Sequence, residues 1–200
     1  MLAIVLRGGD EGELARQRDS LLSRLLRVVL DVTPRTYAEG GREALSEPTW
    51  EPGPEHREAV QNKADDLASE LAKVARGMED DATALLEDVE LARTRGVKFT
   101  DSAGRQQDPE RFARLILDTH DAVIRNAGHL NAAASIGSPA VRVSDGGNPV
   151  RDGRNCEPCA RINGEVWSLQ YAALNPVEHP HCRRSFASMP PGYSGAVDKE

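Results

Sequence analysis

All three cysteines of this 200-residue chain lie within a stretch of 27 residues. Cys156 and Cys159 have two residues between them, and His179 and Cys182 repeat that spacing after a loop of 19 residues. A gap of two residues folds the backbone into a tight turn that aims both side chains at one ion, and the loop brings the second turn opposite the first. Thiolates with one imidazole suit Zn²⁺ and leave no open position for a catalytic water. The sequence therefore predicts a closed, structural zinc site.

His181 is the other candidate for the histidine ligand. It adjoins Cys182 directly, so its side chain is expected to point away from the turn, and we favour His179. Two other interpretations of the cluster are cysteines that bind no metal in a small core, and a catalytic cysteine–histidine pair. Neither explains the repeated spacing. An odd number of cysteines in a reducing compartment also favours metal ligation over disulfides.

Helical periodicity dominates the chain before this cluster. Apolar residues that recur every three or four positions predict helices at about residues 11–32, 54–95 and 108–136. Pro34 is expected to stop the first of these, and the proline- and glycine-rich stretch that follows is expected to be mostly a connector. Pro54 suits the first turn of the second helix and Gly96 suits its end.

The second helix carries the most regular apolar stripe, from Val60 to Ala92, with one extra step of four residues in its middle. A helix of about 40 residues spans roughly 60 Å, which is long for a domain of this size. Its stripe must be covered, because an exposed apolar seam of that length would promote aggregation. We expect either the other helices or a second copy of the chain to cover it.

The pattern changes after Pro139. Residues 140–144 alternate like a strand, Asn163-Gly164 predicts a type I′ hairpin turn, and residues 185–187 suit another strand. Trp167 and Phe186 are expected to form an apolar lid. The predicted fold is therefore mainly α, with a long-helix region over 1–138 followed by a small zinc-stabilised domain with a β-hairpin over 139–200. Metal binding should contribute much of the folding free energy of that domain.

Charge and hydropathy restrict the partners. Residues 1–138 carry 18 basic and 25 acidic side chains, and an acidic surface repels phosphates, which argues against DNA or RNA binding there. The opening six apolar residues before Arg7 are too few for a signal peptide or a membrane span. We therefore expect a protein that is made in the cytosol and makes no membrane contact.

Two alternative functions involve the C-terminal part. A zinc-stabilised nuclease would need a general base and a magnesium-binding acid, for which the nearby side chains are His181, Asp152 and Glu178. A nucleic-acid-binding zinc module would use the arginines of this region as phosphate contacts, although seven acidic side chains balance them. Those arginines are Arg142, Arg151, Arg154, Arg161, Arg183 and Arg184. Elsewhere, His120 and His129 are expected to have ordinary packing or surface roles.

A run of residues around the predicted ligands matches a family signature in order and spacing. The residues are Cys156-x-x-Cys159, Ile162-Asn163-Gly164, Val166-Trp167 and His179-Pro180-His181-Cys182-Arg183. They resemble the C-terminal end of the phage head morphogenesis proteins, the Mu F-like minor head proteins of tailed bacteriophages. That family pattern closes on His-Pro-x-Cys-Arg-Cys, and Arg184 stands here where the pattern has its last cysteine. The match covers about a quarter of the chain.

The resemblance implies a non-enzymatic minor capsid protein that acts in head morphogenesis. It implies association with the phage portal or the major capsid protein, first in the host cytoplasm and then in the virion. Long helices that precede a cysteine-rich end also resemble the family's organisation. The resemblance implies no catalytic residue, and it carries over a role to the four metal ligands alone: Cys156, Cys159, His179 and Cys182.

Overall fold

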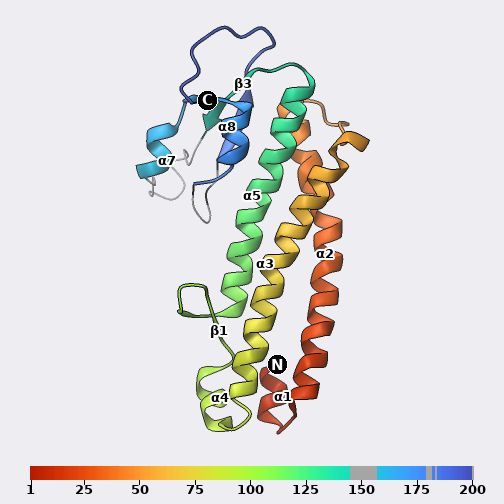
Figure 1. Cartoon of the computed structure of the whole chain (residues 1–200), viewed down its shortest axis with the longest axis vertical. Coiled ribbons are helices and arrows are strands. Elements are labelled where there is room, and N and C mark those ends of the chain that lie inside the picture. Colours follow the sequence, from red (N-terminus) through yellow and green to blue (C-terminus); the bar gives the residue numbers. More distant parts are fainter. Residues whose placement is uncertain (145–156, 179–181, 183, 200) are drawn as a thin grey trace. The chain divides into compact units, whose positions relative to one another are not determined.

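The structure is a computed structural model that describes residues 1–144, 157–178, 182 and 184–199. Helices account for 64% of the described residues, and the described strands are few and short, which confirms a mainly α fold. The long helices of the described residues are labelled in Figure 1. They are α2 (Glu11–Leu45), α3 (Arg57–Ala84) and α5 (Pro109–Ser135). The short helices are α1 (Leu2–Leu6), η1 (Pro54–His56), α4 (Val89–Arg95), α7 (Glu157–Ile162) and α8 (Leu169–Leu174).

The described strands form two antiparallel sheets. Strands β1 (Phe99–Thr100) and β2 (Gln106–Gln107) make a two-stranded hairpin. The second sheet has the order β4-β3-β5, formed by β3 (Ala140–Ser144), β4 (Val166–Ser168) and β5 (Ser185–Ser188). In its register Val141 lies opposite both Trp167 and Ser188. β3 and β5 lie where the alternating sequence predicts strands.

The outer edge of β4 is covered by the last described residues of the chain. The Ser168 amide donates to the Lys199 carbonyl at 2.8 Å, and the Asp198 amide donates to the Val166 carbonyl at 2.7 Å. The Asp198 carboxylate also accepts from the Val166 amide at 2.8 Å. These bonds satisfy backbone groups that an exposed edge strand would leave unpaired.

The chain packs into two compact units, and α2, α3 and α5 contribute to both. Unit 1 is Met1–Asp31 with Ala64–Leu117, and unit 2 is Val32–Lys63 with Asp118–Glu200. One apolar cluster of unit 1 consists of Ile4, Val5, Leu14, Ala82, Leu85 and Ala92. A cluster of unit 2 consists of Leu130, Val141, Val143, Trp167, Ala172 and Phe186. A division of the chain near residue 138 stays a prediction.

Pro34 does not end the first long helix, contrary to the sequence prediction. α2 continues through it to Leu45. A helical proline removes one backbone hydrogen bond, here to the carbonyl of Leu30. Both residues are exposed, so water can solvate that carbonyl. The residues after the proline include buried Tyr37 and Ala38, whose packing outweighs the local cost.

The predicted helix at 54–95 is interrupted. α3 ends at Ala84, and α4 begins at Val89 after Asp88, whose carboxylate accepts from the Leu91 amide at 2.9 Å. This aspartate is a helix N-cap, which favours a new start over continuation. Most of the apolar stripe is nevertheless buried, as expected. Its buried members are Ala64, Leu67, Leu71, Val74, Ala82, Leu85 and Ala92.

The hairpin predicted at Asn163-Gly164 is wrong. Ile162 is the last residue of α7, and Gly164 has a φ of 92°, the left-handed conformation typical of a residue just after a helix end. The Gly164 amide donates to the Val143 carbonyl at 2.8 Å. The turn therefore links helix α7 to strand β4 and does not join two strands of a hairpin. β4 pairs with β3, which precedes α7 in the sequence.

No helix in the described part of the chain is both long and apolar enough to cross a membrane.

Candidate metal centre

The two cysteines within the described residues both lie buried in unit 2. Cys159, in α7, is 2% exposed, and Cys182, three residues before β5, is 4% exposed. Neither is in a disulfide. Buried thiols of this kind have the donor chemistry that a structural zinc ion requires, because thiolate ligands are deprotonated by the metal and shielded from water. The two residues therefore fit the predicted ligand roles.

The other predicted ligands, Cys156 and His179, lie outside the described residues, as does the alternative ligand His181. Within the described ranges, no three His, Cys, Asp or Glu side chains converge in a metal-binding group. The four-ligand site formed by Cys156, Cys159, His179 and Cys182 therefore stays a prediction.

Arg184 is fully buried, an unusual environment for a guanidinium group. Its side chain is 0% exposed and forms an ion pair with Glu178 at 3.0 Å. Its Nη1 donates to the Asn175 carbonyl at 2.6 Å, and its Cζ lies 4.9 Å from the centroid of the Trp167 ring. Burial of a charge is tolerated only with partners of this quality. Arg184 thus ties the chain after α8 to the start of β5.

Asn126 of α5 reaches the same segment. Its side-chain Nδ2 donates to the Pro176 carbonyl at 2.8 Å and to the Arg184 carbonyl at 2.9 Å. The residue is 2% exposed, so its two donors are satisfied by the protein itself. Sequence reasoning missed Asn126, because an asparagine in an amphipathic helix is not unusual as a residue type. Its position could have indicated its role, since it lies among the apolar residues of the buried face of α5.

Some of the residues named for the two alternative functions lie among the described residues. Arg184 is buried and paired, so it is not available to a phosphate. Glu178, a candidate metal-binding acid of a nuclease, is the partner of that arginine. Arg142 and Arg161 are exposed.

His129 has the packing role that was expected. It is 5% exposed, its Nε2 lies 3.2 Å from Ser188 Oγ, and its ring lies 6.4 Å from that of Phe186. Desolvation by burial lowers the pKa of His129 from 6.5 to about 4. The ring is therefore neutral at physiological pH and connects α5 to β5.

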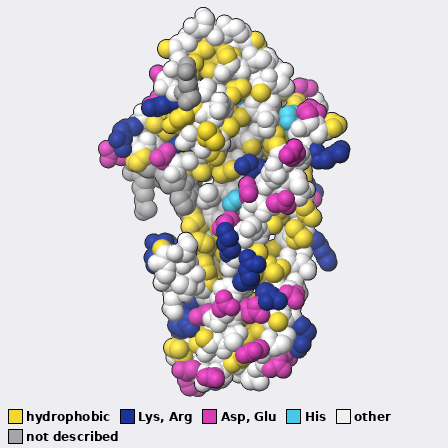
Figure 2. Space-filling model, viewed as in Figure 1, with side chains coloured by type: hydrophobic (Ala, Val, Ile, Leu, Met, Phe, Trp, Pro, Cys, Tyr) yellow, Lys and Arg dark blue, Asp and Glu magenta, His cyan; other side chains and the backbone are white. Residues whose placement is uncertain are grey.

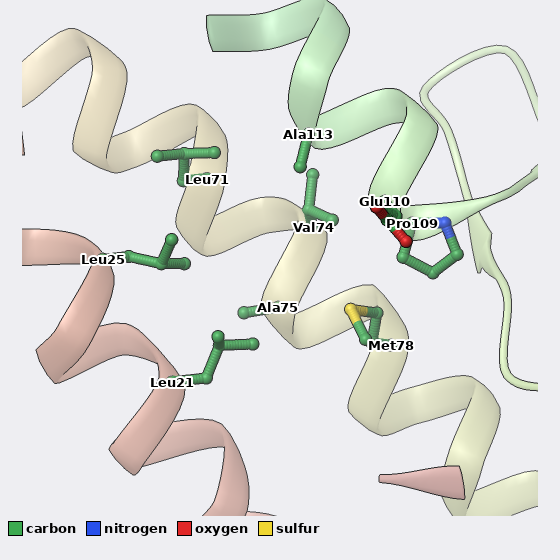
Figure 3. A pocket seen from close by; sticks show the side chains of 9 residues that line it. All are labelled: Leu21, Leu25, Leu71, Val74, Ala75, Met78, Pro109, Glu110 and Ala113. Carbon is green, nitrogen blue, oxygen red and sulfur yellow. The ribbon is translucent and has the colours of Figure 1, made fainter. Parts of the chain in front are cut away.

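An open groove runs along the helices of unit 1 (Figure 3). It has a volume of about 210 Å³, and all but one of its lining side chains are apolar. We call it the apolar groove; its lining residues are Leu21 and Leu25 of α2, Leu71, Val74, Ala75 and Met78 of α3, and Pro109, Glu110 and Ala113 of α5. Val28 and Leu117 continue the two flanks at helical spacing and are 52% and 39% exposed.

Charged side chains of both signs are intermixed on the face of the molecule shown in Figure 2. In unit 1, Arg18 forms an ion pair with Glu79 at 2.6 Å, and Arg95 forms one with Asp81 at 3.0 Å. Arginines paired in this way are less available to a phosphate than unpaired ones.

Comparison with known proteins returned no match: no protein family, curated protein or solved structure is detectably similar to this chain.

Proposed function

We propose that the chain is a structural, non-enzymatic minor head protein of a tailed bacteriophage. The observation that carries the proposal is the paired spacing of Cys156, Cys159, His179 and Cys182, together with the burial of both cysteines that the structure describes. Residues 139–200 would hold one zinc ion in a closed site. A closed site stabilises a fold and has no position for substrate.

The apolar groove supports the binding of another subunit. Three helices line it and leave one side open, which is the geometry that accepts the apolar face of a further amphipathic helix. The exposed Val28 and Leu117 would extend that contact. We propose that a helix of the portal or of the major capsid protein occupies the groove in the assembled head.

The apolar stripe on α3 overlaps the groove, because Leu71 and Val74 belong to both. These two residues are 3 and 5% exposed within one chain, so helix packing covers most of their surface without a second copy. Self-association through this helix stays a prediction.

Mass spectrometry of purified virions tests the proposal directly. We expect the chain in particles that have been separated from free protein, and one equivalent of zinc in the purified protein. Particles without the chain would rule out the head-protein role, and zero or two equivalents of zinc would contradict the site.

A substitution in the groove tests the docking surface. Ala113 lines the groove and is half-buried, so Ala113→Arg should fill it with a charged side chain. We expect the variant to fold and to be incorporated into heads less than wild type. Ala134→Arg is the matched control, because Ala134 is exposed on the same helix outside the groove. Equal incorporation of both variants would show that the groove is not the docking surface.

A further inference from the structure

The outer edge of β4 carries backbone groups that another strand could bond. Pairing with β3 leaves the amide and carbonyl of Val166 and the amide of Ser168 on the side away from β3. Residues 198 and 199 bond all three groups. The Val166 carbonyl accepts from the Asp198 amide at 2.7 Å, and the Val166 amide donates to the Asp198 carboxylate at 2.8 Å. The Ser168 amide donates to the Lys199 carbonyl at 2.8 Å.

We call residues 190–199 the strap. Only Tyr193 and Val197 of the strap are half-buried, and its other residues are exposed. These two side chains pack on one apolar cluster, which consists of Ala140, Val166 and Met189. Among the described residues, the strap is thus held on β4 by three hydrogen bonds and two side chains. Its withdrawal removes no strand of the sheet, because β3 pairs with β4 and β5 independently of it.

β4 lacks the features that usually protect an edge strand. Its sequence, Val166-Trp167-Ser168, contains no charged residue and no proline, either of which would discourage pairing with another chain. The outward-facing groups are also self-complementary. In an antiparallel pair across a twofold axis, the Ser168 amide of each copy faces the Val166 carbonyl of the other. The edge without its strap therefore fits a second copy of itself.

We propose that the outer edge of β4 is a self-association surface that the strap keeps closed in the single chain. When the strap is withdrawn, the β4 strands of two copies pair across a twofold axis and join their three-stranded sheets into one continuous sheet. The strap prevails in the wild-type chain because it is tethered, at an effective concentration of roughly millimolar. This surface belongs to unit 2, whereas the apolar groove belongs to unit 1.

Asp198→Pro in the full-length chain opens the edge, because proline supplies neither the amide donor nor the carboxylate. Asp198 is exposed, so its replacement creates no cavity. Sedimentation velocity over a range of protein concentrations measures the fraction of dimer. We expect that fraction to rise with concentration in Asp198→Pro and to stay at the wild-type level in Asp198→Asn, which keeps an amide donor and a side-chain oxygen. Asp198→Ala loses the side-chain bond alone and should give an intermediate fraction.

Equal dimer fractions in wild type and Asp198→Pro at every concentration would overturn the proposal. Ala113→Arg, in the apolar groove, should leave the dimer fraction of Asp198→Pro unchanged. Loss of the dimer on that second change would assign the contact to the groove and would also overturn the proposal.

A synthetic peptide of residues 190–199 identifies the surface. Added in excess to Asp198→Pro, it should occupy the open β4 edge and dissociate the dimer, whereas the same peptide with proline in place of Asp198 should not. Dissociation by neither peptide, or equally by both, would place the contact elsewhere and overturn the proposal. Peptide binding to an Asp198→Pro protein that stays monomeric would show that the edge accepts an extended segment but no second copy, which overturns it as well.

Discussion

Two glycines let α2 and α5 pack backbone to backbone in unit 2. A Cβ added at Gly40 would overlap the Arg125 carbonyl oxygen, and one added at Gly128 would overlap the Tyr37 carbonyl oxygen. Both neighbours are backbone atoms, which cannot rotate away as a side chain can. Tyr37 of α2 and Asn126 of α5 are both buried. The contact therefore depends on the absence of a side chain at two positions.

Gly40→Ala should destabilise the protein by about 2 kcal/mol or more, because the two helices must separate to admit one methyl group. Chemical denaturation measures the change. Gly12→Ala is the control: it lies in the first turn of the same helix, where the nearest atoms are side-chain atoms of Asp10 and Arg16 at 3.2 and 3.4 Å. There the added methyl group should be neutral or slightly stabilising. Equal effects at both positions would argue against the close contact.

His129 should make the stability of unit 2 depend on pH. Its pKa is about 4 in the folded protein and 6.5 in the unfolded chain, so the unfolded chain binds a proton over a range in which the folded protein does not. The free energy of unfolding is therefore unaffected by this residue above pH 6.5. It should fall as the pH drops from 6.5 towards 4, by on the order of 3 kcal/mol in total.

The control for this prediction is His129→Gln, which keeps a donor near Ser188 but does not titrate. Both proteins are denatured at pH 7.5 and at pH 5, which gives the change in the free energy of unfolding between the two pH values for each. The change in wild type minus the change in the variant is the contribution of the histidine. Wild type should lose more stability than the variant between the two values. The same loss in both proteins would assign the pH dependence to another group.

At the level of single elements, Pro34 is a local defect in an otherwise regular helix. The residue is exposed, so its replacement removes no buried contact. Pro34→Ala restores an amide donor for the Leu30 carbonyl, worth about 3 kcal/mol in a helix interior, and gives about 1 kcal/mol of freedom back to the unfolded chain. We expect a net gain of roughly 1 to 2 kcal/mol in the free energy of unfolding.

Arg27→Ala, at another exposed position of α2, is the reference for a change in helix propensity alone. A loss of stability in Pro34→Ala would mean that the packing of buried Thr36 and Tyr37 requires the bend that a proline imposes. Denaturant unfolding of wild type and the two variants distinguishes these outcomes, because a shift of the midpoint at an unchanged dependence on denaturant concentration reports a change in stability.

The elements that sequence could predict are those with a strong period. The apolar spacing of α5 and the alternation of Ala140–Ser144 locate a helix and a strand because each buries one face. Two signals were misleading: Pro34 lies inside a helix that tertiary packing maintains, and Asn163-Gly164 follows a helix instead of a strand. A third signal was not used, namely Asp88 as the N-cap of a new helix. Asn126 and Arg184 could not be found from spacing, since their partners are backbone carbonyls that folding alone brings within reach.

On the scale of the whole molecule, the C-terminal segments share their core with α5. Leu130 packs in one cluster with Val141, Trp167 and Phe186, and Asn126 binds the carbonyls of Pro176 and Arg184. Removal of zinc from the proposed site should therefore affect unit 2 beyond the cysteine-containing segment itself.

Hydrogen exchange of the zinc-bound and chelator-treated protein tests this expectation. Amides in residues 118–135 and in β3 and β5 should lose protection when zinc is removed, while those in residues 64–84 of α3 should keep it. The free energy of local opening in unit 2 should fall together with the metal occupancy. Loss of protection confined to residues after 138 would instead support a division of the chain at that position.

Unit 2 is built from two stretches that residues 64–117 separate in the sequence. During synthesis, residues 32–63 emerge from the ribosome well before their packing partners at 118–199. All of unit 1 is available earlier, so it can condense while Tyr37, Ala38 and Thr36 still face water. We expect the nascent chain to pass through a state in which unit 1 is folded while residues 32–63 are still accessible to chaperones. Completion of unit 2 then waits for the arrival of α5 and the sheet, a late closure across a long sequence separation that slows folding.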